Sequence, residues 1–184
     1  GESGYLWKNS RGRSSRPGKL AARASARWMM QEEPWKPGYP RDGGKTLFKI
    51  TRALTNSESP AKEARARAWH SCAFINYVHI AGENRRPTTQ QLVAAQQPFL
   101  DLLERLRPRR VLALGKTMWK QMPPNCVPGL YRRNGDLQAY QLADGSLVWV
   151  LALKHPSRGP SWHSYATEIA KFRKQELPHR LASP

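Results

Sequence analysis

Apolar positions at helical spacing are clearest between residues 88 and 106. Thr88 is a good N-cap residue, and it precedes five large apolar side chains that fall on one helical face. They are Leu92, Phe99, Leu102, Leu103 and Leu106. Pro98 lies inside this pattern, where its ring blocks one turn of backbone hydrogen bonding. The pattern therefore predicts a long amphipathic helix with a kink or a restart near Pro98.

Other segments with helical character are spread along the chain. They are Leu20–Gln31, Thr46–Leu54, Pro60–Ala68, Lys116–Met122 and a closing helix from Trp162 to near Pro178. The segment Lys8–Lys19 is rich in Arg, Ser and Gly, which predicts a mobile basic loop. Glu32–Gly44 holds three prolines and three glycines and predicts a second loop.

Four short apolar runs predict strands: Cys72–Val78, Arg110–Leu114, Leu137–Leu142 and Leu147–Leu153. Arg110–Leu114 is expected to be buried, and Asp144-Gly145 between the last two runs is typical of a hairpin turn. Strands that alternate with helices favour an α/β fold. We expect a single domain over residues 1–184, a three-layer α/β/α arrangement with a mostly parallel central sheet of about four strands.

The net charge of the chain indicates the class of partner that it binds. The chain has 31 Lys and Arg against 13 Asp and Glu, a formal net charge of +18. Such an excess favours a polyanion, and nucleic acid is preferred to a membrane because no apolar stretch approaches about 18 residues. The alternative is a generic basic surface or a basic tail.

The cysteines limit the possible cofactors. Cys72 and Cys126 are the only two, and they form no CxxC pair. This excludes a disulfide framework and an all-cysteine zinc or iron–sulfur site within the chain. We expect no metal and no cofactor, and a reducing intracellular compartment. Residues 1–30 also lack the apolar stretch of a signal peptide.

Two polar side chains follow strands predicted to be parallel. Asn76 stands near the end of Cys72–Val78, and His155 comes directly after Leu147–Leu153. Ligands of open α/β sheets bind beyond the carboxyl ends of the strands, so both side chains are expected in one crevice. An amide there could recognise a base edge, beside an imidazole that could stabilise a leaving anion. The alternatives are that Asn76 only caps a strand end and that His155 is structural.

Three runs of sequence resemble the uracil-DNA glycosylase superfamily. Residues 73–115, AFINYVHIAGENRRPTTQQLVAAQQPFLDLLERLRPRRVLALG, resemble the middle of its iron–sulfur class, which has a strand ending in Asn, an NR.PT turn and a PFL helix. Residues 155–161, HPSRGPS, resemble the family's HPS loop, and residues 1–5, GESGY, match the spacing of its first signature. The cysteines of the iron–sulfur class are missing.

The resemblance implies roles for residues of the runs 73–115 and 155–161. Asn76 would recognise the flipped base, and His155 would hydrogen-bond uracil O2. Ser157 and Ser161 would bind phosphates on either side of the target. Arg158 would be a wedge that enters the helix or a phosphate contact, with simple solvation as the alternative. Arg85 and Arg86, in the NRRPT turn, are further DNA-binding candidates.

The first signature carries both support and a departure. Glu2 matches a Glu of one version of the signature and is the available carboxylate to help water attack. Tyr5 falls where another version uses Tyr to exclude the thymine methyl group. Ser3 stands where Asp or Asn orients the attacking water in relatives. The strand that precedes this signature in the family is expected upstream of residue 1.

Three interpretations follow. In the first, the chain is a monomeric DNA-repair glycosylase that flips uracil or a related damaged base and hydrolyses its N-glycosidic bond. In the second, it is a non-catalytic nucleic-acid-binding module on the same fold. In the third, it acts on a free nucleoside or nucleotide. The expected location is the cytoplasm in a prokaryote or the nucleus in a eukaryote.

Overall fold

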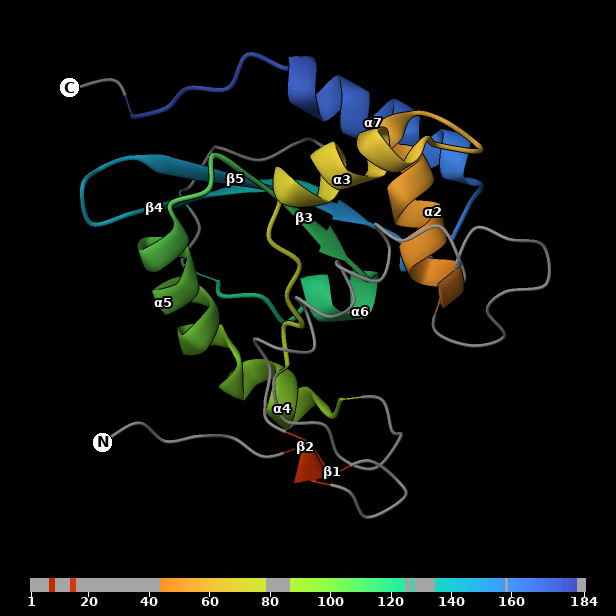
Figure 1. Cartoon of the computed structure of the whole chain (residues 1–184). Helices are drawn as coiled ribbons and strands as arrows, with labels where there is room; N and C mark the ends of the chain where they lie inside the picture. The colour runs from red at the N-terminus through yellow and green to blue at the C-terminus, as the bar shows by residue number, and fades with distance from the viewer. Residues whose placement is uncertain are drawn as a thin grey trace. The chain divides into compact units, whose positions relative to one another are not determined.

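In the computed structural model (Figure 1), the chain forms two compact units. The first comprises Gly1–Pro87 and Ser161–Ala166, and the second comprises Thr88–Pro160 and Thr167–Pro184. The residues that the structure describes are 7–8, 14–15, 44–78, 87–124, 127, 135–157 and 159–181. Each unit is described by itself.

The second unit is built around a sheet of three strands among the described residues. They are β3 (Arg110–Leu114), β4 (Leu137–Gln141) and β5 (Leu147–Leu153), in the order β3-β5-β4. β3 pairs with β5 in parallel, and β4 pairs with β5 antiparallel. All seven residues of β5 are buried because the strand is central and covered on both faces.

The predicted hairpin is confirmed. The turn between β4 and β5 contains Gly145 with φ of 79°, a left-handed conformation that glycine adopts without steric cost. The predicted strand Arg110–Leu114 is also confirmed, with the same bounds. It is half-buried rather than buried, however, since only Ala113 is fully covered. Among the described residues β3 pairs with β5 alone, and a strand with one neighbour has an accessible open side.

Helices pack on both faces of this sheet (Figure 1). Tyr140 of β4 and Phe99 of α5 (Gln96–Leu106) meet edge to face, with ring centroids 5.8 Å apart. On the other face, the guanidinium of Arg110 lies 5.8 Å from the ring centroid of Phe172 in α7 (Trp162–Lys174). Side chains of adjacent strand residues point to opposite faces, and the strand register places Tyr140 and Arg110 on different ones. The unit is therefore three-layered, and the predicted α/β class is confirmed. In place of about four mostly parallel strands, the described residues form a mixed sheet of three.

The helix predicted from residue 88 is confirmed with the restart expected at Pro98. Thr88 caps α4 (Thr89–Ala94) through a capping box, in which its hydroxyl oxygen accepts from the Gln91 amide at 3.2 Å. The chain breaks at Ala95 and α5 begins at Gln96, so Pro98 lies in a first turn, where its missing N–H costs nothing. One part of the predicted apolar face is wrong: Leu106 is 46% exposed because it ends the helix.

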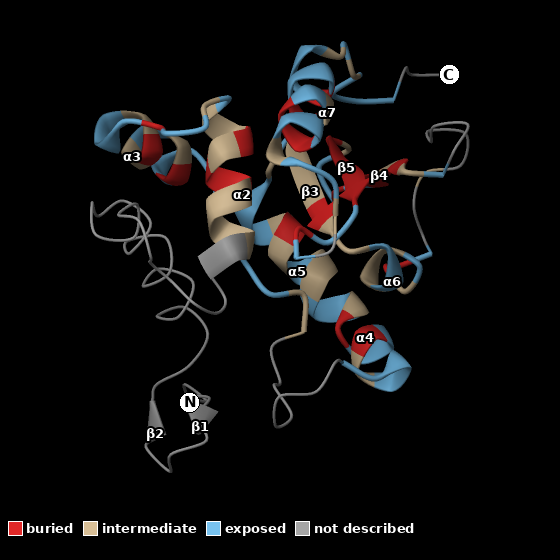
Figure 2. Ribbon diagram, turned by 90° about the vertical axis from the view of Figure 1, so that its right-hand side faces the viewer, coloured by how far each residue is buried: buried red, intermediate tan, exposed pale blue. Residues whose placement is uncertain are grey.

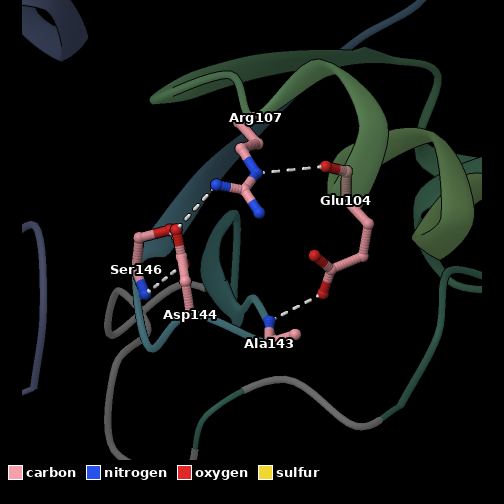
Figure 3. A network of polar contacts seen from close by, with 5 residues as sticks. All are labelled: Glu104, Arg107, Ala143, Asp144 and Ser146. Carbon is pink, nitrogen blue, oxygen red and sulfur yellow. Dashed lines mark hydrogen bonds and ion pairs between the residues drawn. The ribbon is translucent and has the colours of Figure 1, made fainter.

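A polar network fastens the end of α5 to the hairpin (Figure 3). Arg107 ends the helix in a left-handed conformation, with φ of 46°, and its guanidinium lies 3.1 Å from the Asp144 carboxylate. Glu104 accepts from the Ala143 amide at 2.8 Å. Asp144 in turn accepts from the hydroxyl and the amide of Ser146, at 2.6 and 2.9 Å. These bonds order a turn that is otherwise exposed.

Two helices dominate the described part of the first unit. They are α2 (Gly44–Thr55) and α3 (Lys62–His70), and both confirm predictions within two residues. The Trp69 indole N–H donates to the Thr51 hydroxyl at 3.0 Å, and both side chains are buried. Two short strands, β1 (Trp7–Lys8) and β2 (Ser14–Ser15), pair antiparallel. The predicted helix Leu20–Gln31 lies outside the described residues, as do most of the two predicted loops.

The predicted strand Cys72–Val78 is wrong. These residues are described, and they form neither strand nor helix. Most of their side chains are exposed, as Figure 2 shows for the segment after α3, and Ile75 is 36% exposed. An apolar run becomes a strand only when a neighbouring strand satisfies its N–H and C=O groups. Here the segment has no strand partner among the described residues, and Phe74 packs edge-on against Trp69.

The shorter elements agree with the prediction in kind but not in length. α6 (Lys116–Trp119) begins where expected, after Gly115, and is three residues shorter than predicted. α7 ends at Lys174, four residues before Pro178. Within the described residues, no helix is long and apolar enough to cross a membrane.

Candidate active site

The site begins where the two parallel strands end. β5 finishes at Leu153, which is paired with Leu114 at the end of β3. The Gly115 amide then donates to the Leu153 carbonyl at 2.8 Å, which holds the two carboxyl ends together. His155 follows two residues after the end of β5 and is exposed. It therefore emerges at the edge of the sheet where ligands of α/β folds bind.

The hydrogen bonds of His155 determine which of its ring nitrogens is free to donate. The backbone N–H of Ser157 donates to His155 Nδ1 at 3.3 Å, and Ser157 Oγ lies 2.8 Å from the same atom. A backbone amide can only donate, so Nδ1 must accept. In the neutral imidazole the proton therefore resides on Nε2. The loop presents an N–H donor on the ring nitrogen that has no hydrogen bond to Ser157.

Pro156 anchors the loop that carries this ring, and Gly115 lies beside it. Pro156 is fully buried, whereas His155 and Ser157 on either side are exposed, so the proline anchors the loop. Gly115 has φ of 134°, and a Cβ built there would lie 4.0 Å from both Cβ and Cδ2 of His155. The sequence indicated Gly115 only as a turn. Its place directly after a strand parallel to β5 was the signal that it would adjoin His155.

Asn76 lies in the first unit and is held differently. It is exposed on the segment that follows α3. Phe74, two residues earlier, packs edge-on against Trp69, with ring centroids 5.8 Å apart. Trp69 is in turn bonded to Thr51, so a chain of three side chains leads from the helix pair to this segment. Beside Asn76, burial raises the pKa of Tyr77 to about 12, which keeps its phenol protonated.

Ser161 caps the last helix. The Ser164 amide donates to Ser161 Oγ at 3.4 Å, and the two hydroxyl oxygens lie 3.3 Å apart. This is the N-cap arrangement that satisfies one of the free amides of α7. The positive end of a helix of 13 residues thus lies at Ser161. An anion would be favoured at this position.

The structure brings together only part of the predicted site. His155 and Ser157 are adjacent in the second unit, while Asn76 and Ser161 belong to the first. The convergence of Asn76 with His155 therefore stays a prediction. The other predicted residues lie outside the described part of the chain: Glu2, Ser3, Tyr5, Arg85, Arg86 and Arg158.

No metal site is found in the described residues, where no three His, Cys, Asp or Glu side chains gather. Cys72 is exposed, and its thiol lies 3.4 Å from the Ala68 carbonyl oxygen; Cys126 lies outside the described residues.

Comparison with known proteins gives one match. The family model described as the Uracil DNA glycosylase superfamily matches residues 17–174. This range covers most of the chain, including both Asn76 and the loop that carries His155. Searches of curated proteins and of solved structures returned no match to this chain.

Proposed function

The chain belongs to the uracil-DNA glycosylase superfamily, and on that premise we propose that it excises uracil or a related damaged base from DNA. The reaction is hydrolysis of the N-glycosidic bond after the nucleotide has been flipped out of the stack. The single observation that carries the proposal is the hydrogen bonding of His155. This ring stands beyond the carboxyl ends of two parallel strands and offers an N–H donor at Nε2.

The donor has a specific task in this reaction. When the glycosidic bond breaks, the electron pair leaves with the base, and negative charge builds on uracil O2. A fixed N–H that meets this oxygen stabilises the charge, and such a donor typically contributes about 3–4 kcal/mol. His155 meets the requirement for a fixed donor because Ser157 holds the other ring nitrogen and buried Pro156 anchors the loop.

Asn76 would select the base. A carboxamide has one acceptor and one donor group, which match the N3–H and O4 of uracil and mispair with cytosine. A buried, mispaired amide costs about 1–3 kcal/mol, or one to two decades of selectivity. Asn76 is accessible for this role because its side chain is exposed.

Two serines would hold the DNA backbone. Ser161 lies at the positive end of α7, and its surroundings favour a phosphate. Ser157 can also contribute, because its backbone N–H alone keeps His155 Nδ1 an acceptor. Its hydroxyl is then able to rotate and donate to a phosphate oxygen. Contacts of this kind position the strand without recognising its sequence.

Glu2 would be the carboxylate that activates the attacking water. Ser3, which stands where relatives have Asp or Asn, cannot act as an anion at neutral pH. This departure favours a second candidate function, a nucleic-acid-binding module that flips or grips DNA without hydrolysis. It predicts salt-sensitive binding to DNA with no release of base, whereas the glycosylase releases uracil.

An excision assay tests the proposal. An oligonucleotide with a single uracil is incubated with the protein, and alkali then cleaves any abasic site. We expect wild-type protein to produce cleavage and His155→Ala to reduce its rate about 100- to 1,000-fold, with DNA binding retained. His70→Ala is the matched control, since His70 is also exposed but lies at the end of α3. Absence of cleavage with wild-type protein, or equal rates for His155→Ala and wild type, would contradict the proposal.

The tautomer can be measured without activity. With ¹⁵N-labelled histidine, the two-bond nitrogen–proton correlations of neutral His155 should show the pattern of an Nε2–H ring. Ser157→Ala should keep this pattern, because the backbone N–H that donates to Nδ1 remains. A ring protonated on Nδ1 in the neutral form would remove the donor on which the proposal depends.

A further inference from the structure

A basic hollow lies at the opposite end of the sheet from His155. It is open, with a volume of about 570 Å³, and it is formed by the start of β3 and the segment that leaves α7. The residues that line it include Arg109, Arg110, Arg173, Lys174, Glu176 and Pro178. Four of these six are cationic, and Glu176 is the one acidic residue among all the lining side chains. This hollow lies entirely within the second unit.

Basic residues at the last turn of a helix usually serve the helix, because they offset the negative end of its dipole. In α7 this task is performed by Arg110. Its Nε donates to the Phe172 carbonyl at 3.1 Å and its Nη2 to the Gln175 carbonyl at 2.9 Å. One guanidinium thus binds two of the carbonyls that the helix end leaves open. The other cations of the hollow are surplus to what the helix needs.

Those surplus cations are Arg109, Arg173 and Lys174, and all three are exposed. Within the described part of the chain, the observed ion pairs join Arg107 to Asp144 and Lys171 to Glu168. None of the three surplus cations has a carboxylate within ion-pair distance there. Three uncompensated charges on one concave surface attract an anion and cost repulsion without it.

The wall of the hollow is fixed by bonds to β5. The Trp149 indole N–H donates to the Pro178 carbonyl at 2.8 Å. The Leu147 amide donates to the His179 carbonyl, also at 2.8 Å. With the bond from Arg110 to Gln175, the segment after α7 is held at three points. The cations at its edge are therefore presented by an ordered backbone, which reduces the entropic cost of binding.

We propose that this hollow binds the phosphate backbone of a second segment of nucleic acid. It lies at the amino end of β3, whereas His155 follows the carboxyl end of the parallel strand β5. The paired stretch from Arg110 to Leu114 separates the two ends by roughly 13 Å at about 3.3 Å per residue. The net charge of +18 favours nucleic acid over an acidic peptide. With both ends occupied, one protein molecule bridges two DNA segments, whether or not it excises a base.

A bridging assay tests this proposal. Protein is mixed with a biotinylated duplex and a fluorescent duplex, both undamaged, and the fluorescence retained on streptavidin is measured. The test variant combines Arg109→Gln, Arg173→Gln and Lys174→Gln. The control combines Lys62→Gln, Arg67→Gln and Arg105→Gln, which are exposed and lie on α3 and α5. Both variants lose three charges, so each changes from +18 to +15.

We expect the test variant to lose at least about tenfold in bridging, while the control keeps most of it. The log–log salt slope of binding should fall by about 2 to 3 in the test variant, since each lost phosphate contact removes about 0.9. Equal losses in both variants would attribute bridging to net charge and overturn the proposal. Thermal melting of both variants checks that each is folded.

Two further measurements sharpen the outcome. Glu176→Gln removes the single acidic side chain of the hollow, so we expect tighter bridging; an unchanged or weaker value contradicts the proposal. If the test variant loses capture of polyglutamate but keeps capture of DNA, the hollow is a peptide site and the proposal is wrong. The proposed excision activity is scored separately on the single-uracil oligonucleotide, since bridging is measured with undamaged duplexes.

Discussion

His155 and Asn76, the two residues proposed to act on the base, are held by different forces. His155 follows β5, a strand in which all seven residues are buried and which is paired on both edges. Asn76 stands on an exposed segment without strand pairing, and contacts of Cys72 and Phe74 fasten that segment to α3. A hydrogen-bonded ladder fixes direction and register together. Side-chain contacts of this kind fix a place but leave more local freedom.

The difference indicates how His155 and Asn76 would each act in the proposed reaction. A group that stabilises charge in a transition state must be fixed beforehand, because reorganisation would consume the energy it supplies. His155 has this kind of support. A group that recognises a base only after the base has been flipped can be ordered by the base itself, which suits the exposed position of Asn76. If the two regions are independent, a change in one should leave the other unaltered.

Of the effects that test this comparison, the largest expected one is on base selectivity. Asn76→Ala removes the amide that mispairs with cytosine, so the ratio of uracil to cytosine excision should fall about 10- to 100-fold. Single-turnover rates on matched oligonucleotides measure this ratio. Gln90→Ala is the control, since Gln90 is an exposed amide on α4. A ratio that stays at the wild-type value would mean that Asn76 does not contact the base.

Gly115→Ala, in the region of His155, should lower both the stability of the protein and the rate of excision. At φ of 134° an L residue is strained, and we expect a loss of about 1–3 kcal/mol in unfolding free energy. The new Cβ would meet His155 only at 4.0 Å, so the cost arises from the backbone and not from a clash. When the backbone relaxes, the ring moves and excision falls.

Gly135→Ala provides the control for this change. Gly135 also has a positive φ, of 64°, but nothing lies within 4 Å of the position that a Cβ would take there. It should lose about 1–2 kcal/mol of stability through strain alone, with excision unchanged. Denaturant unfolding and excision rates on the same samples separate the two effects. Wild-type excision by Gly115→Ala would show that the glycine does not position His155.

Thr51→Val should weaken the first unit without touching the second. Val has nearly the same shape as Thr but cannot accept the bond from the Trp69 indole N–H, which would be left buried and unsatisfied. We expect a loss of about 1–3 kcal/mol in unfolding free energy. Thr55→Val is the control, because the Thr55 hydroxyl only donates to carbonyls of its own helix.

Hydrogen exchange can show which segments lose stability in Thr51→Val. Amides in residues 72–78 should exchange faster when the support of Trp69 is loosened, while those of β5 should keep their protection. Equal acceleration in β5 would show that the two regions unfold together and are not independent.

The helices and the hairpin could be predicted because their signals are local. Thr88 with Gln91 forms a capping box, Pro98 marks the restart of α5, and Asp144-Gly145 specifies a turn. The strand at Cys72–Val78 was wrong because pairing is not a local property. An apolar run of that length suits a strand or an extended segment equally, and a neighbouring strand decides between them.

Part of the candidate site could be predicted for the same reason. His155 follows an apolar run bounded by a turn, so its place at the end of β5 was predictable. The bond between the Ser157 amide and Nδ1 was not, since it depends on the loop path around buried Pro156. Nor was the hollow at the start of β3, because it joins Arg109 to residues more than sixty positions away.

The smallest expected effect lies at the hairpin and concerns pH. Hydrogen bonds from the Ser146 hydroxyl and amide hold the pKa of Asp144 below its ordinary value of 3.8, with smaller help from Arg107 and Arg180. A depressed folded pKa contributes stability above the unfolded pKa, and that contribution is lost as pH falls through the folded pKa. The carboxylate is exposed to solvent, so the contribution is small.

Asp144→Asn therefore should lower the melting temperature slightly at neutral pH, and the difference from wild type should shrink as the pH falls below about 4. Melting curves of both proteins across the acid range measure it. The turn precedes the amino end of β5, whereas His155 follows its carboxyl end, so base excision near neutral pH should not change. If the melting temperature of Asp144→Asn is still below that of wild type at the lowest pH, the turn depends on the shape of the side chain. Its stability would then owe little to the negative charge that accepts from Ser146.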